Sequence, residues 1–128
     1  MRILLDTHAL LWALSDHSKL TSAARKAIAE ESNEILVSSV SAFEITTKYR
    51  LGKLPEFAEI ASEFPALLTL IDHVPLPITI DHAALAGSLD TPHKDPFDRL
   101  LIAQALVEGV PLVSNEKLFD DFGVQRIW

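Results

Sequence analysis

Short apolar segments that alternate with helical segments are the feature that most constrains the fold of this chain. The clearest are RILL at 2–5, EILV at 34–37 and PLVS at 111–114. Apolar runs of this length between polar residues are typical of buried strands, and longer segments of helical character separate them. Strands and helices that alternate along one chain predict an α/β fold with a mainly parallel sheet.

The remaining elements follow from caps, stops and prolines. Thr21 caps the helix SAARKAIAEE, and Gly52 ends the helix that follows the second strand. The run 95–109, DPFDRLLIAQALVEG, begins with a capping Asp and a Pro and ends in Gly, which predicts a helix buried on more than one side. VPLPI at 74–78 contains two prolines, which indicate an irregular or edge strand. The other expected elements are a helix from Asp6-Thr7 to about Leu14, a helical segment from Pro55, a break at Pro65, the short helices DHAALAG and NEKLFDDF, and a last strand VQRIW.

The composition is that of an ordered globular protein. The 128 residues are 48% hydrophobic, which is enough apolar chain for a real core, and their number predicts one domain over residues 1–128. There is no cysteine, which excludes disulfides and thiolate metal sites and fits a cytoplasmic protein. The apolar segment 1–14 is broken by Asp6 and His8 and is too short to span a membrane.

The charge balance limits the ways in which the chain can bind nucleic acid. A net charge of −7 argues against binding through bulk electrostatic attraction. It leaves open an approach to phosphates through bound divalent cations, which reverse the local charge.

Acidic residues follow the predicted strands. Asp6 comes directly after the first strand, Glu44 lies in the helix after the second, and Glu116 follows the strand at 111–114, while Asp98 lies in the first turn of the helix 95–109. Parallel connections would bring these positions to one edge of the sheet, where carboxylates repel one another unless they are protonated or bridged by a cation. Oxygen ligands without cysteine favour Mg²⁺ or Mn²⁺ over zinc.

Each acid also has a purely structural interpretation. Asp6 is a candidate N-cap, Asp95 and Asp98 a candidate capping pair, and Glu116 a favourable residue for the first turn of a helix. Ser41-x-x-Glu44 has the spacing of a capping box. On a helical projection Glu44 falls beside an expected apolar stripe, where its charge would need compensation. That expected stripe comprises Val40, Phe43, Thr47 and Leu51.

Four segments together resemble the PIN-domain family, in particular the VapC-type toxins of bacterial toxin–antitoxin pairs. They are LLDTHALLWAL, SSVSAFEITTKYRLGKL, DPFDRLLIAQAL and PLVSNEKLFDDFGVQRIW, in the family's order and over essentially the whole chain. The resemblance implies a three-layer α/β/α sandwich with a short, mainly parallel central sheet. It also implies a Mg²⁺- or Mn²⁺-dependent endoribonuclease, with Asp6, Glu44 and Asp98 as the first, second and third acids and metal ligands.

The fourth position departs from the family's pattern of Thr or Ser, one residue, then Asp. Here it is filled by Ser114-Asn115-Glu116. Three arrangements stay open: Glu116 coordinates directly, acts through a water, or leaves the role to Asn115. Ser114 would orient ligands or a water, and Thr7 and Asp95 are expected to support the site, with a cap as the first role of Asp95.

Basic residues and histidines take secondary places. RNA contacts would fall to Lys48, Arg50 and Lys53 and, beside the site, to Lys94 and Arg99, although a solvated helix face explains them equally well. No two of the five histidines have the spacing of metal ligands, so they are interpreted as surface or packing residues. They are His8, His17, His73, His82 and His93.

Two other functions are compatible with the acids. A phosphohydrolase or phosphotransferase with Asp6 as its nucleophile would need a second Asp close behind, and position 8 is a histidine. The other alternative is a catalytically degenerate PIN-like module that binds RNA or protein. RNA cleavage with and without EDTA separates these classes.

Apolar residues outside the predicted strands suggest binding surfaces. They either complete the core or line a self-association face and a groove for a partner helix. The residues are Leu11, Trp12 and Leu14, and Phe64, Leu67, Leu68 and Leu70 near Pro65. The family resemblance implies both a homodimer and a cognate small antitoxin protein, with no membrane partner.

Overall fold

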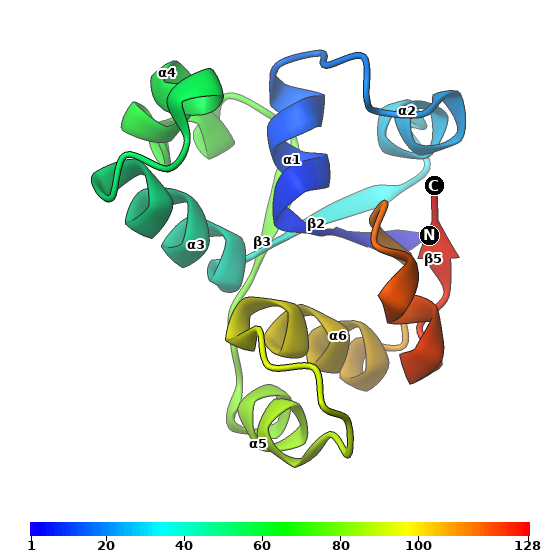
Figure 1. Cartoon of the computed structure of the whole chain (residues 1–128). Coiled ribbons are helices and arrows are strands. Elements are labelled where there is room, and N and C mark those ends of the chain that lie inside the picture. Colours follow the sequence, from blue (N-terminus) through cyan, green and yellow to red (C-terminus); the bar gives the residue numbers. More distant parts are fainter.

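The computed structural model describes residues 1–128 as a five-stranded parallel sheet covered by helices on both faces (Figure 1). The strands follow the order β3-β2-β1-β4-β5 across the sheet, and every neighbouring pair is parallel. They are β1 (Arg2–Leu5), β2 (Glu34–Ser38), β3 (His73–Leu76), β4 (Leu112–Val113) and β5 (Arg126–Ile127). Strand β3, which contains a proline, lies at an edge of the sheet, as its sequence predicts. Proline has no backbone N–H to donate to a neighbouring strand, so it is tolerated at an edge.

The helices begin largely at the predicted caps. Asp6, Thr21 and Asp95 each accept a hydrogen bond from a backbone N–H in the first turn of the helix that follows. The α-helices are α1 (Thr7–Leu14), α2 (Ser22–Ala29), α3 (Ser39–Arg50), α4 (Ala58–Ser62), α5 (Ile80–Ser88) and α6 (Pro96–Glu108). Short 3₁₀ helices are η1 (Pro55–Phe57), η2 (Ala66–Thr69) and η3 (Lys117–Phe122). None of the helices is both long enough and apolar enough to cross a bilayer.

The core consists of two apolar clusters, one on each face of the sheet. Successive strand residues point to opposite faces, so Leu4, Leu36 and Leu112 share one cluster while Ile3 and Leu5 belong to the other. The first cluster packs against α6 and η3, and the second against α1, α2 and α4. This arrangement confirms the three-layer α/β/α sandwich.

Helix α3 starts at the end of the sheet and contacts both clusters. Val40 packs in the cluster beneath α6, and Ile45 packs in the cluster beneath α1. Helix α6 has five consecutive buried residues, Leu101–Ala105, and reaches solvent at its two ends, where Pro96 and Val107 are exposed. The prediction that this helix is buried on more than one side is therefore confirmed.

Of the two interpretations of the apolar residues outside the strands, completion of the core is confirmed for three of them. Leu11, Trp12 and Phe64 are buried in the core, with exposed fractions of 1%, 6% and 6%. The apolar residues of α1 pack in the core cluster on this side of the sheet, and the Trp12 ring packs against Trp128 with 5.6 Å between ring centroids. Of the remaining candidates, Leu70 is largely exposed.

Candidate active site

The carboxyl ends of the three central strands lie at the same edge of the sheet and place the candidate acids. Asp6 follows β1, and its backbone N–H donates to the carbonyl of Val113 at 3.0 Å. Ser38 ends β2 and caps α3, which carries Glu44. Parallel pairing thus brings segments that are far apart in sequence to one place.

A polar cavity of about 210 Å³ opens at this edge. Five carboxylates line it, together with three neutral polar side chains, one lysine and two apolar residues. The lining residues are Asp6, Glu44, Asp95, Asp98 and Glu116; Thr7, His8 and Asn115; Lys48; and Leu101 and Phe119. The four predicted acids therefore come together with Thr7, Asp95 and Asn115, whereas Arg50, Lys53, Lys94 and Arg99 do not line the cavity.

Asp6 is a cap and a buried charge at the same time. Its carboxylate accepts a hydrogen bond from the Ala9 N–H at 2.7 Å, and the residue is only 7% exposed. The pKa of Asp6 is raised from 3.8 to about 6. Burial is the main cause and the like charges of Asp98 and Glu44 add to it, while hydrogen bonds from Ser114 and Ala9 oppose the shift. The N-cap interpretation is thus correct as local structure and does not exclude a role at the cavity.

The capping-box interpretation of Glu44 is wrong. Ser38 is the N-cap of α3, since its hydroxyl accepts from the Val40 N–H at 2.9 Å, and Glu44 lies in the second turn. Ser41 is fully buried and shares a hydrogen bond of 3.0 Å with the Thr7 hydroxyl. Glu44 is therefore free of a capping role and available to the cavity.

The predicted apolar stripe of α3 is also wrong. Phe43 and Leu51 are 64% and 51% exposed, and the buried face of the helix includes Ser41 and Glu44. The helix turns these polar side chains inward because they meet polar partners there. One of these partners is Lys48, one turn further on, whose Nζ lies 2.5 Å from Glu44 Oε2.

Asp98 lies at the mouth of the cavity with its side chain 27% exposed. Asp95 is the N-cap of α6 and accepts hydrogen bonds from the N–H groups of Phe97 and Asp98, which confirms its predicted cap role. The Asp98 carboxylate pairs with His93 Nε2 at 3.0 Å. Burial raises the pKa of Asp98, and the hydrogen bond to His93 opposes this rise.

The fourth position contains two residues at the cavity and one beneath it. Glu116 and Asn115 line the cavity, and Ser114 is fully buried. Glu116 is the N-cap of η3 and accepts from the Leu118 N–H, so it precedes the first turn in which it was expected. The Ser114 hydroxyl accepts from the Glu116 N–H at 3.0 Å and also bonds to Asp6, which links the fourth and first segments of the site.

The comparisons with known proteins agree with this geometry. Residues 3–125 match the PIN domain family. The chain belongs to the PIN-domain family. It is also 34% identical to Ribonuclease VapC22 from Mycobacterium tuberculosis over 120 residues, which are 90% of this chain and 87% of that protein. The resemblance to VapC-type PIN domains that the sequence indicates is therefore confirmed.

Solved structures show the same fold as this PIN domain at low identity. A chain in the structure of VapBC2 from Rickettsia felis, bound to a DNA fragment from the promoter, gives a TM-score of 0.70 at 17% identity, with all of both chains covered. VapC20 from M. tuberculosis, a toxin that cleaves the sarcin-ricin loop, gives a TM-score of 0.68 at 16% identity, with 95% of each chain covered. FitAcB from Neisseria gonorrhoeae gives 0.70 at 16% identity, over 97% of this chain and 95% of that one.

Two histidines belong to the acidic site of this PIN domain, and the sequence interpretation missed both. His8 lines the cavity one position after Thr7, and burial lowers its pKa. His93 binds Asp98. Only their positions in the sequence could have indicated this: His8 lies in the first turn after a strand end, and His93 precedes the capping Asp95 by two residues. A third histidine, His82, is a fully buried packing residue.

Arg99 does not face the site as a candidate RNA contact. Its guanidinium donates to backbone carbonyls of the segment between α5 and α6, including those of Leu89 and His93, each at 2.8 Å. It donates further to the carbonyls of Ala86, Gly87 and Thr91. The side chain therefore has a structural role: it holds the segment that carries His93.

The donors at the cavity fit a hard divalent cation by their chemistry. They are carboxylate and amide oxygens without sulfur, and the raised pKa of Asp6 shows that its negative charge lacks compensation. As they stand, no three acidic or histidine side chains form a ready coordination group. The reason lies in the pairing: Lys48 holds Glu44 and His93 holds Asp98, so a cation would have to replace both partners.

Proposed function

We propose that this PIN domain is a divalent-metal-dependent endoribonuclease and the toxin of a toxin–antitoxin pair. The observation that carries the proposal is the gathering of five carboxylates in one polar cavity at the strand ends. The similarity to Ribonuclease VapC22 supports RNA as the substrate class. The proposed cofactor is Mg²⁺ or Mn²⁺.

The roles of the acids follow from their positions. Asp6, Glu44 and Asp98 would hold the cation, and Glu116 or Asn115 would complete the site directly or through a water. When bound, such a cation lowers the pKa of a water molecule and neutralises charge on the phosphate. Thr7 and Ser114 orient the acids: Thr7 fixes α3 through Ser41, and Ser114 hydrogen-bonds Asp6.

Hydrolysis of a phosphodiester breaks one phosphorus–oxygen bond, and the water supplies the new oxygen on phosphorus and a proton for the leaving oxygen. RNA would contact Lys48, which lines the cavity, and the exposed basic residues Arg50, Lys53 and Lys94. Arg99 drops out of this set because its donors bind backbone carbonyls.

RNA cleavage by the purified protein tests the function directly. We expect cleavage in Mn²⁺ or Mg²⁺, loss in EDTA, recovery when the cation returns, and no cleavage by Asp98→Asn, which keeps the shape and removes the charge. Asp90→Asn, an exposed acid away from the cavity, is the matched control. RNA binding without cleavage under all these conditions would instead establish the degenerate binding module.

The toxin half of the proposal requires a partner. Solved relatives of this fold include VapBC and FitAB assemblies, and a small antitoxin would inhibit by inserting an Arg or Lys among Asp6, Glu44 and Asp98. We expect co-expression with the product of a neighbouring small gene to give a stable, inactive complex of cytoplasmic proteins around a toxin homodimer. A monomer that binds no such protein would leave only the nuclease half.

A further inference from the structure

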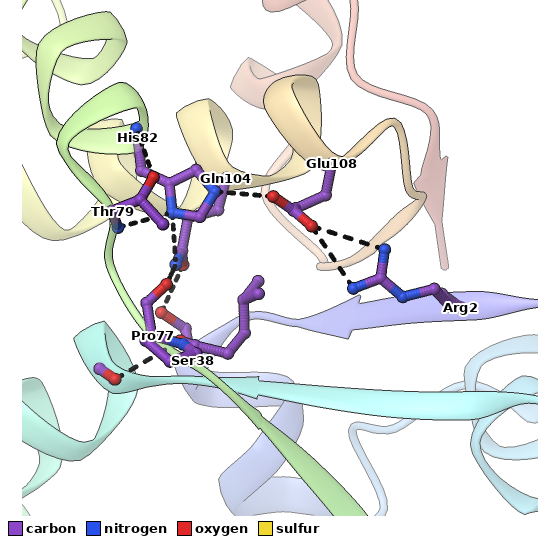
Figure 2. A network of polar contacts seen from close by, with 9 residues as sticks. Arg2, Ser38, Pro77, Thr79, His82, Gln104 and Glu108 are labelled. Atoms are coloured by element: carbon purple, nitrogen blue, oxygen red, sulfur yellow. Dashed lines mark hydrogen bonds and ion pairs between the residues drawn. The ribbon is translucent and has the colours of Figure 1, made fainter.

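A polar network with a fully buried centre joins α3, α5 and α6 (Figure 2). Its centre is formed by Ser38 at the end of β2, Gln104 in the middle of α6 and His82 in α5, with exposed fractions of 1%, 0% and 1%. None of the three lines the cavity. Polar groups are buried at this depth only when partners satisfy them, so their bonds show what the network fixes.

The bonds of Gln104 determine the orientation of its amide. Its Nε2 lies 3.2 Å from the carbonyl oxygen of Pro77, which only accepts, so the nitrogen must face Pro77 and the amide oxygen must face Ser38. The Ser38 hydroxyl donates to Gln104 Oε1 and accepts from the Val40 N–H at 2.9 Å. One hydroxyl therefore joins the first turn of α3 to the middle of α6.

His82 holds Gln104 from the other side. Its Nδ1 accepts from the Thr79 N–H at 3.0 Å, so the ring proton sits on Nε2 and is donated to Glu108 Oε2 at 2.9 Å. Gln104 Nε2 makes a longer contact of 3.4 Å with the same Nδ1. Glu108 in turn binds the Arg2 guanidinium at 3.4 Å, at the start of β1 (Figure 2).

Every buried side-chain nitrogen and oxygen of this network has a hydrogen-bond partner; the one buried side-chain nitrogen without a partner is His73 Nδ1, outside the network. Apolar side chains of similar volume would fill this space with comparable stability, whereas a satisfied polar network specifies one geometry. The geometry it specifies concerns the two helices that carry Glu44 and Asp98. Glu44 lies six residues after Ser38 along α3, and Asp98 lies six residues before Gln104 along α6, a distance of about 9 Å in each helix.

The geometry points to Gln104 as a positioning residue that sets Glu44 against Asp98 through its bond to Ser38, with His82 locking the amide. This inference rests on the proposed function of the acidic cavity and adds residues that never touch it. A change at the Ser38–Gln104 bond would shift α3 relative to α6 and thus alter the spacing of two proposed ligands.

Two readouts on Gln104→Met test the inference: Mn²⁺ affinity by calorimetry, and the separation of Glu44 and Asp98 in a crystal structure. Methionine keeps the volume and removes the hydrogen bonds. We expect the Kd for Mn²⁺ to rise about tenfold, as for other residues that orient ligands. The control is Leu20→Ala, a buried leucine on the opposite face of the sheet, which should lower the Tm at least as much and leave the Kd unchanged.

Ser38→Ala tests the same bond from the other side, also in case Gln104→Met does not fold. Ser38→Ala alone should also raise the Kd, and the double variant should lose less Mn²⁺ affinity than the two single losses added together, because both changes remove the Ser38–Gln104 bond. An unchanged Kd in Gln104→Met overturns the positioning role. If the parent itself binds no Mn²⁺, the proposed metal site is wrong, and the crystal structure of Gln104→Met then tests the positioning role by itself. An unchanged separation of Glu44 and Asp98 would overturn that role, and a changed separation would support it.

Discussion

Removing the charge of Asp6 should stabilise the metal-free protein. A carboxyl whose pKa rises from 3.8 to about 6 on folding makes the folded state less stable by about 3 kcal/mol once it is ionised in both states. Asn keeps an oxygen for the Ala9 N–H and carries no charge, so Asp6→Asn should recover about 1–3 kcal/mol at pH 8. Urea denaturation in EDTA measures this difference.

The sign with pH follows from the direction of the shift. Between about pH 4 and pH 6 the folded parent binds more protons than the unfolded chain, so its stability falls as the pH rises and stays low above this range. The advantage of Asp6→Asn should therefore be present at pH 8 and nearly absent at pH 4. Asp90→Asn is the exposed control and should show no such pH dependence. An Asp6→Asn protein that is no more stable than the parent at pH 8 would refute the burial argument.

Three further predictions concern a bound cation and the side chains of Lys48 and Arg99. Mn²⁺ at 100 times its Kd should stabilise the folded parent by about 2.7 kcal/mol and so raise its Tm in a thermal melt. The double variant Asp6→Asn, Asp98→Asn should show no such rise. Lys48→Met should destabilise the metal-free protein by about 1–3 kcal/mol in a urea titration, since it leaves the buried Glu44 unpaired. Mn²⁺ should restore part of this loss. Lys53 is exposed, so Lys53→Met should leave the free energy of unfolding unchanged. Arg99→Ala should lower the free energy of unfolding by about 2–4 kcal/mol because carbonyls lose a charged donor, whereas an equal loss in Arg50→Ala would contradict the structural role of Arg99.

Most elements of the fold could be predicted from local signals in the sequence. The caps Asp6, Thr21 and Asp95 lie where a side-chain oxygen precedes an apolar helix, and the edge strand β3 contains Pro75 and is followed directly by Pro77. Such signals depend on backbone chemistry within a few residues and are readable without tertiary contacts. The placement of acids after parallel strands also predicted their meeting at one edge.

Several of the wrong predictions arise because tertiary contacts, which the sequence does not show, decide where a side chain lies. The buried face of α3 could not be found from hydrophobicity, because Ser41 is buried against Thr7, a residue of another helix. Charge alone suggested RNA binding for Arg99, while its partners are backbone carbonyls. The Lys48–Glu44 ion pair, by contrast, could have been predicted from the sequence, because the two residues lie four positions apart on one helix.

A crystal of the protein soaked in Mn²⁺ tests the central claim most directly, because anomalous scattering locates the ion without reference to activity. We expect one anomalous peak or two in the acidic cavity, bound by Asp6, Glu44 and Asp98, with the Lys48–Glu44 and His93–Asp98 pairs opened. A saturating soak in which both pairs stay closed and the cavity shows no peak would contradict the proposed metal site.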